Sequence, residues 1–474
     1  MKVKAHRRPG PVIWALQLGL VGMLVPLALD TAAQTTGQAP MQAVAPFPET
    51  MPTFPAPVDG RPAKLPPPES VMPLAEGFDV REFEAMAEAL VEGQRVPGLA
   101  MAIVHNGQVL SARGYGITDV RAAEPVDAHT VFRLASLSKS FAGTIAGLLV
   151  SEGAMRWDSR VVDYMPGLRM SDPEAAQMIT VADVLSHRVG LGRHTYDRAI
   201  ERGVEYNTLV QQLAEAPMTC QPGDCYGYQN LAFSLVGDVV FATSGQFFNE
   251  AVSRRLFKPL GMHDASYGLD GIQGSPRWAK PHVRAGRGWT SLIPKPTYYR
   301  VAPAAGVNAS ISDMAQWLIA NMGYRPDVLP APLLSTLHAP VVGTPGEIRG
   351  RSTSWRHQRL NSAGYGLGWR IYDYSGHRMV FHGGAVQGYR GAMAMLPERD
   401  LGVVILWNSG SSLPSGLMPT ILDRAIGLSG DPWLAIDYDY DADDIRYGDE
   451  GSGGHEDPAR RAGASASTSH AMPE

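Results

Sequence analysis

Segments that favour strands lie near both ends of this chain, and segments that favour helices fill the part between them. Residues 99–104 and 108–115 flank Asn106-Gly107, a pair that supplies the positive φ angles of a tight hairpin. Strand-like segments return at residues 367–372, 379–382, 389–396 and 402–407. Because late strands need partners, we expect them to pair with the early hairpin in one antiparallel sheet.

Helical spacing of apolar residues dominates the middle of the chain, from Ser136 to about Leu318. The clearest examples are residues 141–150 and 231–243, and helices are also expected at residues 80–93 and 417–426. The sequence therefore predicts an α+β fold. Its antiparallel sheet is built from both chain ends and flanked by helices, with a mostly helical inserted domain at about residues 136–360.

The first 33 residues have the order of a signal peptide. Lys2, Lys4, Arg7 and Arg8 precede an apolar run at residues 12–29, and small residues follow up to Ala33. We expect cleavage after Ala33 and a periplasmic or secreted protein. The alternative is an uncleaved membrane anchor, although the run is near the lower length limit of a spanning helix.

The remaining chain divides into three parts by composition. Residues 34–75 are rich in proline and indicate an extended linker, and residues 76–430 form the expected folded domain. Residues 431–474 pass from an acidic run at 437–444 into glycine, serine and alanine, which predicts a disordered tail.

The charge pattern argues against a nucleic-acid-binding protein. The formal net charge is −5, and basic residues are spread along the chain rather than gathered into a stripe. No polybasic membrane patch and no specific protein partner is predicted.

Two cysteines, Cys220 and Cys225, lie close together around Pro222-Gly223. In an oxidising compartment they could form a small disulfide loop, and the alternative is two free thiols. No histidine pair accompanies them, so a zinc site is not expected.

Ser136 and Lys139 are the first candidate catalytic pair. They lie three residues apart, immediately before the apolar helical run that begins at Phe141. This spacing puts both side chains on one face of a helix start, where free N–H groups favour an anion. A buried lysine in this position could help to remove the serine proton. An isolated match of this kind is more often an ordinary helix cap.

Tyr228 and Asn230 precede a second apolar helix in the middle of the chain. A tyrosine hydroxyl near an ammonium group could act as a general base, and the asparagine amide could orient a substrate carbonyl. The alternative is a packed ring followed by a cap.

His382, Gly383, Gly384 and Ala385 lie on a predicted late strand. Glycines at a strand edge allow a substrate backbone to approach, and a free N–H group there could face an oxyanion. A glycine-rich hairpin would explain the same residues.

Taken in order along the chain, these motifs resemble the class C β-lactamase family, which includes D-alanyl-D-alanine carboxypeptidases, D-aminopeptidases and esterases. The resemblance covers roughly residues 76–430. It implies that this domain is a serine hydrolase with the β-lactamase/transpeptidase-like type of α+β fold, acting on a small-molecule substrate. It extends to further landmarks in family order: residues 132–135, 185–191, 222–223, 257–262 and 365–369.

The resemblance implies roles for these residues. Ser136 would form an acyl-enzyme with Tyr228 and Lys139 as its base system, and Asn230 would bind the substrate amide. The N–H groups of Ser136 and Ala385 would form the oxyanion hole. His382 would line the opposite wall of the cleft, beside Gly383 and Gly384. The resemblance implies no metal and no organic cofactor.

Departures from the family pattern bear on the substrate. Many β-lactamases of this family have lysine, threonine and glycine where this chain has His382, Gly383 and Gly384. The lost threonine hydroxyl would have donated a hydrogen bond to a substrate carboxylate, worth about 1.5–3 kcal/mol. Gln229 also departs from the usual serine or alanine, and we expect its side chain to point away from the site.

The main prediction is an exported hydrolase that cleaves a β-lactam or a D-amino-acid amide through an acyl-enzyme on Ser136. An esterase using the same site is the nearest alternative. A penicillin-binding sensor or binding module without turnover is the alternative from another class. Residues 271–299 are expected to form part of the cleft rim.

Overall fold

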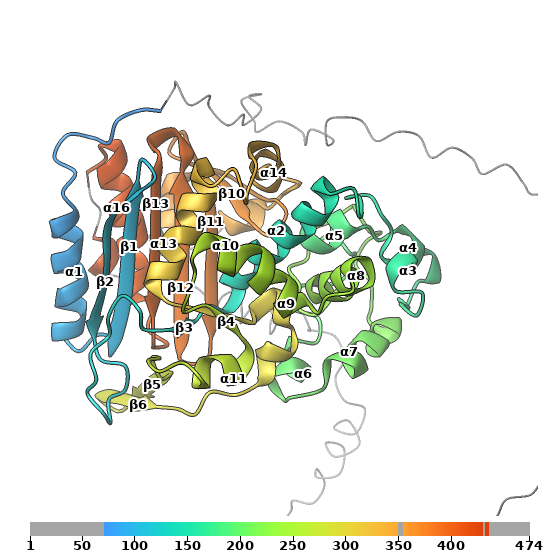
Figure 1. Cartoon of the computed structure of the whole chain (residues 1–474), viewed down its shortest axis with the longest axis horizontal. Coiled ribbons are helices and arrows are strands. Elements are labelled where there is room, and N and C mark those ends of the chain that lie inside the picture. Colours follow the sequence, from blue (N-terminus) through green and yellow to red (C-terminus); the bar gives the residue numbers. More distant parts are fainter. Residues whose placement is uncertain (1–70, 349–353, 430–431, 436–474) are drawn as a thin grey trace, which may run out of the picture. The chain divides into compact units, whose positions relative to one another are not determined.

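The computed structural model describes residues 71–348, 354–429 and 432–435 (Figure 1). The predicted signal peptide, most of the predicted linker and the acidic run at 437–444 lie outside these residues. Within the part that is described, no helix is long and apolar enough to cross a membrane.

An antiparallel sheet of eight strands is the main feature of the described residues (Figure 1). Its strands are β1 (Gly98–His105), β2 (Gln108–Gly116), β8 (Val342–Gly343), β9 (Leu360–Tyr365), β10 (Arg370–Tyr374), β11 (His377–Val386), β12 (Tyr389–Leu396) and β13 (Leu401–Trp407). They are arranged in the order β2-β1-β13-β12-β11-β10-β9-β8. Leu99 of β1 pairs with Trp407 of β13, so the two chain ends meet inside the sheet. The predicted α+β fold with a shared antiparallel sheet is confirmed.

Helices cover both faces of the sheet. They are α1 (Val80–Glu92) and α16 (Leu417–Ile426) on one face and α13 (Ile311–Ile319) on the other. Alternate residues of β1, such as Leu99, Met101 and Ile103, share a hydrophobic core with residues of α1 and α16. This is the period-two burial expected for a strand, whose successive side chains point to opposite faces.

The early hairpin forms as the sequence predicts. Asn106 and Gly107 have φ angles of 50° and 68°, which a two-residue turn between β1 and β2 requires. The helices predicted at 80–93 and 417–426 are α1 and α16. The strand expected at 367–372 begins only at Arg370, because Gly366-Leu367-Gly368 forms a turn. Gly368 has a φ of 88°, and a Cβ there would lie 2.4 Å from the carbonyl oxygen of Lys139.

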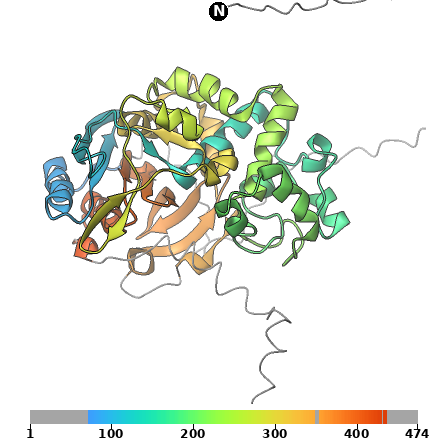
Figure 2. The same ribbon diagram turned by 90° about the horizontal axis from the view of Figure 1, so that it is seen from below.

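Short helices are the main regular elements of the segment between β2 and β8 (Figures 1 and 2). They are α2 (Ser138–Ser151), α3 (Val161–Tyr164), α4 (Pro173–Met178), α5 (Val181–Leu185), α6 (Asp197–Glu201), α7 (Tyr206–Gln212), α8 (Leu235–Ser244), α9 (Phe248–Val252), α10 (Lys258–Leu260), α11 (Gly268–Gln273), α12 (Ala302–Ala305) and α14 (Ala331–Leu337). A short helix α15 (Trp355–Arg359) leads into β9. Figures 1 and 2 show helices α3 to α9 on the side of the sheet away from α1.

Two small sheets complete the described part. β3 (Phe132–Arg133), β7 (Val307–Ala309) and β4 (Ser266–Tyr267) form one, and β5 (His282–Ala285) pairs with β6 (Gly288–Ser291) in the other. The three-stranded sheet matters for the site because β3 leads directly into the turn that carries Ser136.

Candidate active site

Ser136 lies in a tight turn between β3 and α2. A 3-10 turn spans Ala135–Leu137, and α2 continues from Ser138. Ala135 has a φ of 49°, a left-handed conformation that is uncommon for a residue with a side chain. Leu134 and Lys139 are buried, whereas Ser136 is partly exposed. The turn therefore presents one hydroxyl to a pocket while its neighbours are held in the core.

Lys139 is fully buried next to this hydroxyl. Its Nζ lies 3.3 Å from Ser136 Oγ, 2.7 Å from Asn230 Oδ1 and 3.2 Å from the carbonyl oxygen of Ala304. These are three directed contacts from one side chain, so they fix the ammonium or amine group beside the nucleophile.

Asn230 is fixed in turn by Asp197 at the start of α6. Asn230 Nδ2 donates to Asp197 Oδ2 at 2.8 Å, and the same carboxylate oxygen lies 2.8 Å from His194 Nδ1. This contact assigns the Asn230 amide orientation, because the nitrogen must face the carboxylate and the oxygen must face Lys139. Asp197 and His194 were not among the predicted site residues. Their spacing in the sequence is ordinary, and only the fold brings them to Asn230.

Tyr228 covers the lysine from the other side. Its side chain is 4% exposed, and the Lys139 Nζ lies 4.7 Å from the centre of its ring. Gln229, between the two site residues, is buried and donates through its amide to Gly192 O, away from the pocket as expected. The three predicted residues Lys139, Tyr228 and Asn230 are thus brought together with Ser136.

The His187 ring packs against the Tyr228 ring. The two ring centres are 4.4 Å apart, and His187 Nδ1 accepts a hydrogen bond from Gln229 N at 3.1 Å. Burial, and then the nearby charge of Lys139, lower the pKa of His187 well below its usual value. The ring is therefore neutral at physiological pH, so it supports the tyrosine without adding a charge.

A buried ion pair lies near the same ring. Arg370 on β10 is 2% exposed, and its Cζ is 5.4 Å from the Tyr228 ring centre. Arg370 Nη1 bonds to the Glu347 carboxylate, which also accepts a bond from Tyr372 Oη. Sequence reasoning missed this pair, since Glu347 and Arg370 are ordinary charged residues until the sheet buries them.

Gly384 brings β11 against the serine turn. A Cβ at this position would lie 2.5 Å from Leu134 O, 2.7 Å from Leu137 Cδ1 and 3.1 Å from Ser136 N. Only glycine fits so close an approach. As a result Gly383, Gly384 and Ala385 line the same small pocket as Ser136, Tyr228 and Asn230.

His382 does not take the place that the sequence predicted. We expected it to line the cleft wall, but its side chain is fully buried and does not line the pocket. Its Nε2 lies 3.1 Å from Tyr365 Oη, a hydroxyl that is itself buried on β9. A polar ring at a buried position needs such a partner, so the histidine turns into the protein rather than toward the substrate.

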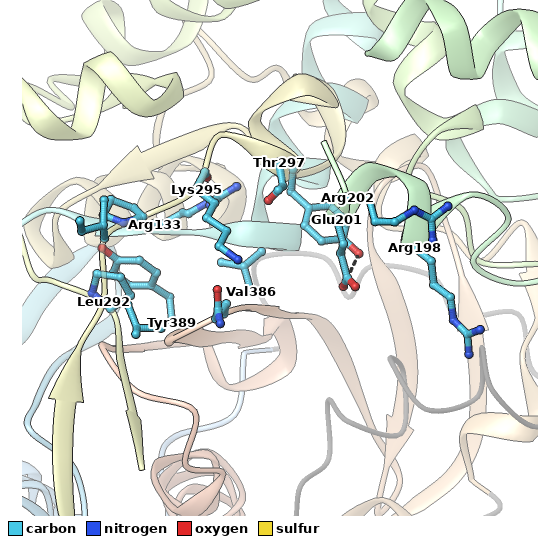
Figure 3. Close-up of a pocket in the computed structure, with 14 residues that line it drawn as sticks. Arg133, Arg198, Glu201, Arg202, Leu292, Lys295, Thr297, Val386 and Tyr389 are labelled. Atoms are coloured by element: carbon cyan, nitrogen blue, oxygen red, sulfur yellow. Dashed lines mark hydrogen bonds between the residues drawn. The ribbon is translucent and has the colours of Figure 1, made fainter. Parts of the chain in front are cut away.

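The small pocket has a volume of about 80 Å³ and continues into a larger cavity of about 620 Å³ (Figure 3). Glu201, Tyr298, Val386 and Gln387 line both. Residues 292–295, 297 and 298 line the larger cavity, in agreement with the rim predicted for residues 271–299.

Two further predictions concern the cysteines and metals. Cys220 and Cys225 form a disulfide in a surface loop rather than two free thiols. Among the residues that the structure describes, no three His, Cys, Asp or Glu side chains are grouped so as to hold a metal ion.

Known proteins resemble this chain in sequence and in fold. The family model described as Beta-lactamase matches residues 83–427. Penicillin-binding protein 4 of Amycolatopsis lactamdurans is 28% identical over 344 residues, covering 70% of this chain and 86% of that protein. The unguisins hydrolase ungD of Aspergillus violaceofuscus is 24% identical, covering 75% of this chain but only 65% of that protein.

A solved structure shows the same fold. The octameric penicillin-binding protein homologue from Pyrococcus abyssi superposes with a TM-score of 0.65 at 24% sequence identity. The match covers 74% of this chain and 78% of that one.

Proposed function

Because this chain belongs to the beta-lactamase family of serine hydrolases, we propose that it cleaves amide bonds in peptides that contain D-amino acids, through an acyl-enzyme on Ser136. The proposal includes export, since the N-terminal segment has the order of a signal peptide. The observation that supports the catalytic part most directly is the set of three contacts made by the buried Lys139.

The contacts of Lys139 place its Nζ for proton transfer with Ser136. Asn230 Oδ1 and Ala304 O are acceptors only, so each takes an N–H from Nζ. The same nitrogen lies 3.3 Å from Ser136 Oγ, within reach of the hydroxyl proton. In the neutral state Lys139 is oriented to accept the hydroxyl proton.

The reaction then proceeds in two halves. Ser136 Oγ bonds to the substrate carbonyl carbon as its one proton passes to the neutral Lys139, with the Tyr228 ring beside it as the second member of the base system. The negative carbonyl oxygen would be held by the N–H groups of Ser136 and Ala385, which Gly384 brings close together. The amide C–N bond breaks, and the amine leaves with a proton returned from the base. A water molecule attacks the resulting ester by the same route in reverse and releases Ser136.

Two features favour a D-amino-acid peptide over a β-lactam antibiotic. The strand next to the nucleophile carries Gly383, which has no hydroxyl for the carboxylate of a β-lactam. The nucleophile pocket also opens into a cavity of about 620 Å³, which has room for several residues of a peptide. The names of two relatives, a penicillin-binding protein and an unguisins hydrolase, support a peptide-like substrate.

The test compares three substrates with wild type and two serine variants. N-acetyl-D-alanyl-D-alanine, nitrocefin and p-nitrophenyl acetate are incubated in turn with the protein, and products and intact protein mass are measured. Ser136→Ala should abolish turnover. Ser138→Ala is the matched control, because its hydroxyl accepts a bond from Val307 N and does not line the pocket.

The outcomes separate the competing functions. Release of D-alanine by wild type and by Ser138→Ala, but not by Ser136→Ala, would support the proposal. Turnover of nitrocefin alone would instead indicate a β-lactamase, and turnover of the ester alone an esterase. A stable adduct on Ser136 without product release would indicate a sensor.

A further inference from the structure

The larger cavity ends in a pair of basic side chains. In Figure 3, Arg133 lies beside Leu292 and Tyr389 at one end of the cavity, and the Lys295 side chain extends toward Val386. Val386 also lines the nucleophile pocket. A substrate attached to Ser136 could therefore extend past Val386 toward both cations.

Arg133 is an unusual residue for the floor of a cavity, because a buried arginine normally has a carboxylate partner. Arg133 is only 4% exposed. Nη1 donates to the carbonyl oxygen of Lys295 at 3.2 Å, and the guanidinium stacks 3.7 Å from the Tyr299 ring centre. Among the described residues, Nε and Nη2 have no hydrogen-bond partner.

The neighbours of Arg133 give it no compensation within the described part of the chain. The titratable groups that act on it are tyrosines, which carry no charge at neutral pH, and burial lowers the pKa of Arg133 from its usual value. The one acidic side chain that lines the cavity is Glu201, which accepts a hydrogen bond from Tyr298 at 3.3 Å. Figure 3 shows this carboxylate on the far side of Lys295 from Arg133.

We infer that the end of the cavity formed by Arg133 and Lys295 binds a carboxylate carried by the substrate. This inference rests on the proposed function, since it concerns a second part of the molecule that Ser136 attacks. The carboxylate would accept hydrogen bonds from Nε and Nη2 of Arg133, and the ammonium group of Lys295 would contact it from the loop at residues 292–298. Guanidinium geometry matches a carboxylate with two parallel hydrogen bonds.

The walls around the two cations indicate what links the carboxylate to the reacting carbonyl. Leu292, Pro294 and Val386 are apolar residues that line this cavity. In Figure 3, Leu292 lies at the Arg133 end, and Val386 lies nearer the middle. A chain of methylene groups or an apolar side chain would contact them. The substrate class is therefore an acyl or leaving group that carries an acidic end on an apolar spacer.

Matched esters measure this preference without assuming a natural substrate. The first pair is p-nitrophenyl hydrogen adipate and its neutral methyl ester, which place the charge in the acyl part. The second pair is the acetate esters of 3-hydroxybenzoic acid and of its methyl ester, which place the charge in the leaving group. The measured quantity is the ratio of kcat/KM for the charged over the neutral member of each pair.

We expect wild type to prefer the charged member of at least one pair by about tenfold or more, as for a hydrogen-bonded charge. Arg133→Met should bring that ratio close to one. Lys295→Glu should reverse it, and because Lys295 is exposed this variant should fold even if Arg133→Met does not. Lys258→Gln, an exposed lysine that does not line this cavity, is the control and should leave the ratio unchanged.

A purely structural role for Arg133 gives a different result. Loosening the loop would lower kcat/KM for charged and neutral esters together and leave the ratio intact. Ratios that stay within twofold of wild type in Lys295→Glu, or a wild-type ratio near one in both pairs, would overturn the inference. Failure of the proposed acyl-enzyme is distinct, because then neither ester of a pair would be hydrolysed in a Ser136-dependent way. Failure of the proposed amide substrate is read separately, from the absence of D-alanine release in the three-substrate test.

Discussion

Replacing Gly384 with alanine tests how closely β11 must approach the serine turn. The added Cβ would lie 2.5 Å from Leu134 O and 2.7 Å from Leu137 Cδ1. An ordinary contact needs about 3.4 Å, so the strand and the turn must separate by about 0.9 Å at the first of these contacts. Both contacts belong to well-packed backbone and core, so the strand itself must move.

This displacement acts on catalysis through Ala385. The N–H of the next residue on the strand is the proposed second donor to the oxyanion, and its distance from Ser136 would grow by a similar amount. Losing one oxyanion donor costs about 10²–10³ in kcat, and a misplacement of about 1 Å costs about 10². We therefore expect Gly384→Ala to lower kcat about 100-fold, with a loss of about 1–3 kcal/mol in the free energy of unfolding from overpacking.

The assay is the steady-state rate with the best of the three substrates above, together with circular dichroism and urea unfolding. Gly343→Ala is the matched control, because it lies on β8 of the same sheet and an added Cβ meets no atom of the described residues within 4 Å. Gly343→Ala should keep wild-type kcat. A folded Gly384→Ala protein whose kcat stays within threefold of wild type would refute the reasoning about the oxyanion site.

Three further predictions concern stability. Arg370→Met should lower the free energy of unfolding in urea by about 3–5 kcal/mol, because it leaves the Glu347 charge buried without this cation. Adding Glu347→Gln should recover most of the loss, and no recovery would contradict a buried Arg370–Glu347 ion pair. Burial lowers the pKa of His338 to about 3, so the unfolded chain binds a proton near pH 6.5 that the folded protein does not, and stability falls as the pH drops from about 6.5 toward 3. His338→Gln should flatten that decline between pH 7 and 4, and equal slopes in the two proteins would count against it. Replacing Cys220 and Cys225 together by serine should lower the free energy of unfolding by about 2 kcal/mol, because their disulfide closes a short loop. The kcat should stay unchanged. If a reductant does not affect the unfolding of the wild-type protein, that result would argue against this disulfide.

The sheet could be predicted from the sequence because its signals are local. Asn106-Gly107 specifies a hairpin, and the last strand, at residues 402–407, is continuously apolar. The start of β10 was placed too early because Leu367 and Trp369 are apolar residues with strand propensity. Their real constraint is the packing of Gly368 on α2, a contact with Lys139 that is 229 positions away in the sequence and leaves no local signal.

The candidate site was predictable only in part, for a similar reason. Ser136, Lys139, Tyr228 and Asn230 were found because each precedes an apolar helix at a recognisable spacing. His382 was misplaced, since a strand position does not say which buried hydroxyl a polar ring will meet. The supporting residues around the site, Asp197, His194, Arg370 and Glu347, carry no pattern in the sequence, because only tertiary contacts give them their roles.

The position of the site explains which parts of this chain are free to set its specificity. The nucleophile turn and β11 are held by contacts that tolerate no added atom, as the space around Gly384 shows. The opposite side is formed by the loop at residues 292–298, where Ile293 is 82% exposed and Lys295 is exposed as well. Substitutions in this loop cost little stability, because few of its side chains are in the core. Chemistry is therefore fixed by the sheet and α2, whereas the choice of substrate depends on the loop and on the buried Arg133 beneath it.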